Sequence, residues 1–149
     1  MDAALKIQFK KLHPAAVVPK RATKDSAGFD LVATEDVTVF GGLGNFMVPT
    51  GLAIQMPPGH CGIIMMRSGL AVREHLAVSA GVIDRDYVGE LKVVVFHTGG
   101  GKSSYTIRAG ERFAQILIKK ISYADSIEVE EFADLTSESH AGFGSTGKF

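Results

Sequence analysis

The chain lacks the features that mark several large classes of protein. Its 149 residues include one cysteine, Cys61, so an intrachain disulfide is impossible and a reducing compartment is favoured. We expect Cys61, which lies in an apolar run, to be a buried and unreactive thiol. The N-terminus lacks the layout of a signal peptide, and no stretch approaches the ~20 apolar residues of a membrane span. The sequence therefore predicts a cytoplasmic or nuclear protein.

Net charge and the common metal- and phosphate-binding patterns are also missing. Lysine plus arginine and aspartate plus glutamate each number 16, whereas a nonspecific nucleic-acid binder would carry a basic surplus. The five histidines have no zinc-site spacing with one another or with the cysteine. Gly101-Lys102-Ser103 resembles the end of a P-loop, but it lacks the earlier glycine and the following helix. We expect a surface loop there.

Helical periodicity is absent, and glycine is abundant. The chain has 17 glycines, and no segment keeps a helical period for three turns. Short β-rich runs alternate instead with turn sequences. This pattern predicts an all-β fold, a jelly-roll-like antiparallel barrel or sandwich, with residues 1–132 as one domain and a short helix at 69–75. The expected strands are residues 6–11, 28–33, 37–40, 45–56, 60–66, 91–97, 105–108, 113–121 and 127–131.

The last residues differ in composition from the rest. Residues 133–149 are polar and rich in glycine and serine, which is typical of a disordered end. Phe143, between two glycines and followed by Ser145 and Thr146, also suits a mobile flap. Its ring could stack on a ligand, and the hydroxyls and backbone amides after it could bind phosphate oxygens. The residues alone leave both interpretations open.

A nearly symmetric decapeptide, residues 81–90, reads GVIDRDYVGE. As a β-hairpin with its tip between the two aspartates, it would place Ile83 opposite Tyr87 on one face. Asp84 and Asp86 would then project from the other face. Such a hairpin could hold a flat polar ring through its backbone amides, with a base beside it. The alternative is an ordinary acidic surface turn with a buried tyrosine.

Three further stretches place polar side chains beside apolar runs. Asp30 could anchor a loop, or it could hold water around a divalent cation. Arg67, Ser68 and Gly69 follow an apolar run, and this triplet could form an anion cradle at a strand-to-helix junction. Gln115, in a later strand, could position a water molecule or satisfy a buried backbone group.

Taken in order, five motifs of this chain resemble those of the trimeric deoxyuridine triphosphate nucleotidohydrolase (dUTPase) family. The resemblance runs from about residue 27 to residue 148. The order and spacing of the motifs make it specific, although each motif is weak alone. The motifs read AGFDL at 27–31, RSGLA at 67–71, GVIDRDY at 81–87, GERFAQ at 110–115 and GFGSTG at 142–147.

The resemblance implies an activity and an assembly. The subunit would be a jelly roll in a homotrimer, with active sites shared between subunits. The reaction would be hydrolysis of dUTP to dUMP and pyrophosphate with Mg²⁺, which limits uracil in DNA and supplies dUMP for thymidylate synthesis.

The resemblance also implies roles for single residues. Asp84 matches the general base that polarises a water for attack on the α-phosphorus, and Gln115 matches a position near that water. Asp30 would contact Mg²⁺ through water. The matching substrate-binding positions are Arg67, Ser68, Gly69, Gly81, Val82, Ile83, Asp84, Tyr87, Lys92, Phe143, Gly144, Ser145 and Thr146.

For the base and sugar, the resemblance implies recognition by the residues 81–87. Backbone groups there would read the edge of uracil and so exclude cytosine, and the tightness of the hairpin would exclude the thymine methyl group. Tyr87 would lie under the sugar and clash with a 2′-hydroxyl. Phe143 would close over uracil from a neighbouring subunit, with residues 133–149 acting as the flap.

The chain departs from the family pattern where the last motif begins. Glu138 and Ser139 stand where arginine and glycine are usual, and the resemblance implies that this arginine contacts the terminal phosphates. A carboxylate there would repel phosphate. One alternative is therefore a nucleotide-binding or signalling protein that keeps the fold but hydrolyses poorly. Another is an enzyme related to dCTP deaminase, although residues 81–87 and Phe143 fit dUTPases better.

Overall fold

The structure, a computed structural model, describes residues 5–101 and 103–133. This part of the chain consists of short strands and a six-residue helix, which confirms the predicted all-β class. The strands are β1 (Gln8–Lys11), β2 (Phe29–Val32), β3 (Val37–Phe40), β4 (Phe46–Pro49), β5 (Leu52–Gln55), β6 (His60–Met66), β7 (Leu76–Ala80), β8 (Val82–Ile83), β9 (Lys92–His97), β10 (Ser104–Ile107) and β11 (Arg112–Lys120), and the helix is α1 (Ser68–Arg73).

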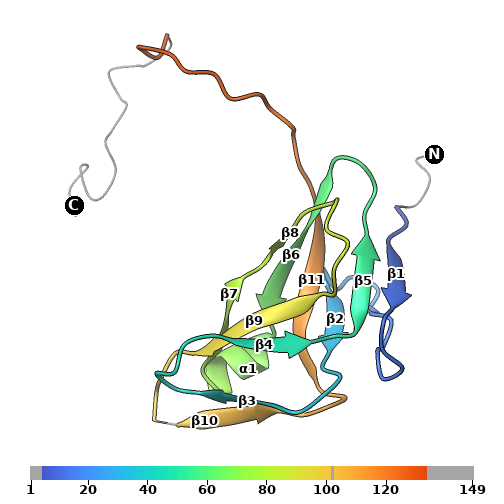
Figure 1. Ribbon diagram of the computed structural model, residues 1–149, viewed down its shortest axis with the longest axis vertical. Helices are drawn as coiled ribbons and strands as arrows, with labels where there is room; N and C mark the ends of the chain where they lie inside the picture. Colours follow the sequence, from blue (N-terminus) through green and yellow to red (C-terminus); the bar gives the residue numbers. More distant parts are fainter. Residues whose placement is uncertain (1–4, 102, 134–149) are drawn as a thin grey trace.

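The strands pair in small antiparallel sheets. Their orders are β2-β11-β6-β8, β4-β9-β7, β1-β5 and β10-β3. Partners such as β3 and β10 lie far apart in the sequence, as in jelly rolls. In Figure 1, β2, β6 and β11 run along the long axis, and β3, β4, β9 and β10 cross it near one end. The chain after β11 leads away from the body. Within residues 5–101 and 103–133, no helix is long and apolar enough to cross a membrane.

Buried and more exposed residues alternate along the strands, and the buried apolar side chains form the hydrophobic core. In β9, for example, Val93, Val95 and His97 are buried, and the residues between them are partly exposed. Cys61 is buried and free, as expected. The largest fully buried side chains come from several sheets and from loops: Phe113, Leu31, Leu52, Met56, Ile64, Leu76, Leu91, Ile107, Ile116, Val39, Val48 and Val93.

Three expectations about strands were wrong. The strand expected over residues 45–56 is divided into β4 and β5, because Gly51 has a φ of 65° and turns the chain. Residues 127–131 form no strand, and Ile127 is 81% exposed. β7 was not expected, because two of its five residues are alanine and the strand lacks a clear β signature.

The hairpin predicted for residues 81–90 is correct only at its turn. The Tyr87 amide donates to the Asp84 carbonyl at 3.2 Å, so the chain does reverse there. Ile83, however, lies opposite Gly62 of β6 and not opposite Tyr87. The Tyr87 hydroxyl donates to the Glu90 carbonyl at 2.7 Å. The segment is therefore an edge strand, a turn and an irregular return.

Close approach of other atoms explains the two glycines that bound this segment. A Cβ atom at Gly81 would lie 2.6 Å from the carbonyl oxygen of Ile64, which belongs to β6. A Cβ atom at Gly89 would lie 2.6 Å from the hydroxyl oxygen of Tyr87. Contacts this short require the neighbouring atoms to move, and the neighbour of Gly81 is backbone.

The substitution Gly81→Ala should therefore destabilise the fold by about 1–3 kcal/mol, the usual cost of overpacking. Denaturant unfolding followed by circular dichroism measures the loss. Ser79→Ala, at an exposed position of β7, is the matched control and should stay within about 0.5 kcal/mol of the parent chain. Equal midpoints for Gly81→Ala and Ser79→Ala would contradict the close approach.

Candidate active site

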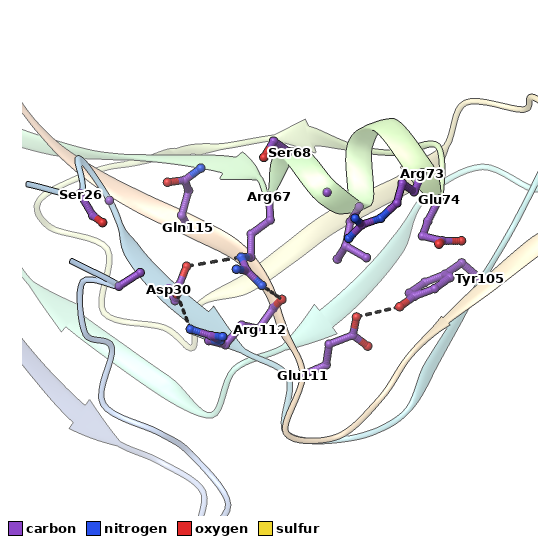
Figure 2. Close-up of a pocket in the computed structure, with 14 residues that line it drawn as sticks. Ser26, Asp30, Arg67, Ser68, Arg73, Glu74, Tyr105, Glu111, Arg112 and Gln115 are labelled. Carbon is purple, nitrogen blue, oxygen red and sulfur yellow. Dashed lines mark hydrogen bonds and ion pairs between the residues drawn. The ribbon is translucent and has the colours of Figure 1, made fainter.

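One cavity collects polar side chains from three of the stretches that the sequence singled out. It has a volume of about 550 Å³, and Asp30, Arg67, Ser68, Gly69 and Gln115 all line it (Figure 2). These residues meet because β11 pairs with β2 on one side and with β6 on the other. Gln115 lies opposite Asp30, and Arg67 follows directly after β6.

The Asp30 carboxylate lies between two guanidinium groups. One carboxylate oxygen is 3.6 Å from Nε of Arg67, and the other is 3.3 Å from Nη1 of Arg112. Arg67 also donates from Nη1 to the carbonyl of Arg112 at 3.0 Å. The Asp30 side chain is only 15% exposed, and each of its two oxygens faces one of these partners. The three groups hold one another in place beside the cavity.

Two glycines leave room for functional side chains. A Cβ atom at Gly28 would lie 2.8 Å from Oε1 of Gln115, so the amide occupies space that another residue would fill. A Cβ atom at Gly69 would lie 2.9 Å from Nη2 of Arg73. The guanidinium of Arg73 therefore lies against the first turn of α1, on the cavity side (Figure 2).

The opposite end of the cavity has its own hydrogen bonds. The Tyr105 hydroxyl donates to Oε1 of Glu111 at 2.8 Å, and the backbone amide of Arg108 donates to Oε2 at 2.9 Å. Burial, reinforced by the bond to Glu111 and its charge, raises the pKa of Tyr105 to about 12. Tyr105 is therefore a neutral donor at neutral pH.

Sequence reasoning did not single out the residues Arg73, Tyr105, Glu111 and Arg112. Glu111 and Arg112 lie inside the GERFAQ motif, and Arg73 lies two residues after RSGLA, so proximity to a motif was a usable signal for them. Tyr105 had no such signal. It lies in β10, the strand before β11, and lines the cavity beside its hydrogen-bond partner Glu111.

The acidic turn lies outside this cavity. Asp84 lines a different one, together with Asp86, Cys61, Ile121 and Tyr123. Tyr87 lines a third cavity, beside β1 and β5. In one chain, the expected base and the expected phosphate cradle are therefore separated.

The other predicted substrate-binding residues are spread further. Gly81 and Val82 line an apolar hollow beside β6, and Ile83 is a partly buried residue packed on the core. Lys92 lines yet another cavity and lies 3.6 Å from the carboxylate of Glu90. Four predicted positions, together with Glu138, lie outside the described residues: Phe143, Gly144, Ser145 and Thr146.

A metal ion would need help from a ligand in this cavity. Within the described residues, no group of three or more histidine, cysteine, aspartate or glutamate side chains could hold one. Asp30 is a single carboxylate whose two oxygens already face arginines. Mg²⁺ usually keeps several waters and binds through one or two carboxylates plus substrate phosphates. A Mg²⁺ ion here would therefore need most of its ligands from water and from a bound phosphate.

The family model and the relatives with similar sequences all point to the same family. The dUTPase family model matches residues 15–147. The chain is 43% identical over 142 residues to the deoxyuridine 5′-triphosphate nucleotidohydrolase of fowl adenovirus A serotype 1, covering 95% of this chain and 78% of that protein. It is 41% identical over 146 residues to the enzyme of the same name from Wolinella succinogenes, covering 97% of this chain and 95% of that protein.

Solved structures agree with these relatives. A mutant dUTPase of Staphylococcus bacteriophage 80alpha with dUpNHpp superimposes with a TM-score of 0.86 and 28% identity, covering 95% of this chain and 98% of that chain. A mutant dUTPase of phage phi11 of S. aureus, described with a structural Mg(II) ion, gives a TM-score of 0.76 and 25% identity over 85% of this chain and 98% of that one. The predicted jelly roll is confirmed by this likeness. The chain belongs to the dUTPase family.

Proposed function

We propose that this chain, a dUTP nucleotidohydrolase by its family, hydrolyses dUTP to dUMP and pyrophosphate at sites that copies of the chain build together. The observation that carries the proposal is the separation of Asp84 from the cavity around Arg67. Both are needed at one triphosphate, because the base must reach the α-phosphorus while cations hold the phosphates. A second copy can supply the missing half.

An apolar surface beside the separated residues supports assembly into a homotrimer. Met65 is 52% exposed, Val72 is 74% exposed and Val82 is 68% exposed. Met65 and Val82 line the same hollow. Apolar side chains gathered on a surface favour burial against another protein, and a second copy of this chain would bury them.

The chain's own residues divide the work at the phosphates. Arg67, Ser68 and Gly69 would bind phosphate oxygens through the guanidinium, the hydroxyl and the backbone amide. Gln115 would orient the attacking water from the neighbouring strand. Mg²⁺, bound with the nucleotide through the water shell beside Asp30, would neutralise charge on the triphosphate.

Asp84 is the proposed general base. Its side chain is exposed at a turn, and within the described residues no hydrogen bond or ion pair engages its carboxylate. The group is therefore available to accept a proton from water. Its backbone carbonyl is fixed by the Tyr87 amide, which limits where the side chain can reach. Once the proton is taken, the water oxygen attacks the α-phosphorus and pyrophosphate leaves.

Selection for deoxyuridine is proposed to lie in residues 81–87. The hydroxyl end of the Tyr87 ring is held by its hydrogen bond to the Glu90 carbonyl and lies close against Gly89. A fixed ring under the sugar would exclude a 2′-hydroxyl. Phe143 would cover the uracil from a neighbouring copy, with residues 133–149 as a flap over the site and with Gly144, Ser145 and Thr146 at the phosphates.

Removing the proposed base should abolish turnover but keep binding. Asp84→Asn should lower kcat by about 10²–10⁴, the usual contribution of general base catalysis. Its affinity for dUpNHpp with Mg²⁺ should change little. Pyrophosphate release and calorimetric titration measure the two quantities. Asp86→Asn makes the same charge change in the same turn and is the control. Full activity of Asp84→Asn would refute the role.

Mixing two inactive variants tests the shared site. Asp84→Asn and Arg67→Gln should each be inactive, whereas chains co-refolded in equal amounts should recover activity. If each site takes Asp84 from one copy and Arg67 from another, about a quarter of the sites in random trimers are intact. A mixture as inactive as its parts would mean that each chain completes its own site.

Glu138 motivates the alternative of a weakened enzyme. A carboxylate near the terminal phosphates would oppose binding. If the chain is a competent dUTPase, Glu138→Arg should change kcat/KM for dUTP by less than about tenfold, since a single ion pair in contact with solvent contributes ~1 kcal/mol or less. Glu138→Gln separates loss of repulsion from gain of attraction. A gain of several hundredfold in Glu138→Arg would favour the weakened nucleotide-binding protein.

A further inference from the structure

Arg73 differs from the other arginines that line the cavity of Figure 2. Arg67 and Arg112 are both committed to the Asp30 carboxylate. For Arg73, the described part of the chain offers no hydrogen bond or ion pair, although its side chain lines the same space. Its positive charge is therefore available to a ligand.

The position of the Arg73 guanidinium is set by α1. Arg73 lies one helical turn after Gly69, and the absence of a side chain at Gly69 lets Nη2 lie against the start of the helix. Figure 2 shows the guanidinium directed from the helix toward the middle of the cavity. A residue larger than glycine at position 69 would displace it, because its Cβ would lie 2.9 Å from Nη2.

The acidic groups at this end of the cavity are already occupied. Glu111 accepts hydrogen bonds from Tyr105 and from the Arg108 amide on its two carboxylate oxygens. Glu74, which also lines the cavity, has an interaction of its own. Among the described residues, an anion that enters here would meet one cation without a hydrogen-bond or ion-pair partner, Arg73, and acids that already have partners.

The polar residues lie in a definite order along the cavity. Gln115 lies at one end and Arg73 toward the other, with Arg67 and Ser68 between them (Figure 2). The inference rests on the proposed function, in which the α-phosphorus lies near Gln115. The triphosphate would then extend along Arg67 and Ser68. We propose that Arg73 binds the outermost phosphate of the substrate, and the same group in pyrophosphate, and so selects triphosphates over shorter nucleotides.

The substitution Arg73→Gln in the full chain tests the proposal by calorimetric titration. With Mg²⁺ present, Kd for dUpNHpp should rise about tenfold or more, because a charge-assisted hydrogen bond is lost. Kd for dUMP, which lacks the outer phosphates, should change less than about twofold. Kd for inorganic pyrophosphate should rise in parallel with that for dUpNHpp. Arg73→Lys keeps the charge and should recover part of the loss.

Arg108→Gln is the matched control, because it removes the same charge from a guanidinium that is bound to Asp36 outside the cavity. It should leave all three affinities unchanged. Equal weakening of dUMP and dUpNHpp by Arg73→Gln, or no weakening of either, would overturn the role of Arg73. Failure of the parent chain to bind dUpNHpp more tightly than dUMP would instead overturn the proposed function.

Discussion

The pairing of β11 with β2 on one side and β6 on the other is the constraint on which the site depends. It places Asp30 opposite Gln115 and brings Arg67 to the same edge. The amide of Arg67 donates to the carbonyl of Phe113, a fully buried residue of β11, so the start of the cradle is tied to the core. The backbone pairing of the strands thus positions these side chains, and the surrounding loops contribute little to their placement.

The Asp30 network is better understood as positioning than as stabilisation. A mostly buried carboxylate loses hydration, and its ion pairs repay that loss only in part. What the two guanidiniums provide is a fixed carboxylate orientation and a fixed Arg67, before any ligand arrives. Preorganised groups of this kind cost no reorganisation when a phosphate binds. Arg67 and Arg112 belong to this network, but Arg73 does not. Within the described residues, a phosphate could therefore bind Arg73 without breaking an ion pair or hydrogen bond.

The acidic turn follows a different logic. Gly81 lets β8 approach β6, and Gly89 lets the Tyr87 ring fold back onto Glu90, so both glycines serve packing. The segment is therefore closely packed at both glycines, while Asp84 between them is exposed. Under the proposed function, in which Asp84 meets a ligand held mainly by another chain, this arrangement leaves its carboxylate accessible to that ligand.

Much of the fold could be predicted from sequence, because alternating apolar and polar residues indicate a strand with one buried face. The strands at 37–40 and 60–66 were predicted to the residue. The errors came from tertiary effects: the positive φ of Gly51 broke one run, and residues 127–131 had the right alternation but no strand to pair with among the described residues. β7 had a weak signature and forms because β9 offers it an edge.

By itself, the sequence determined which side chains are chemically able to act and the order in which they occur, since the motifs are local. Only the tertiary structure decided which of them share a cavity. It joined Asp30, Arg67 and Gln115, added Arg73 and Tyr105, and set Asp84 apart. The physical reason is that cross-strand hydrogen bonds connect residues distant in the chain, and their register depends on the packing of the whole core.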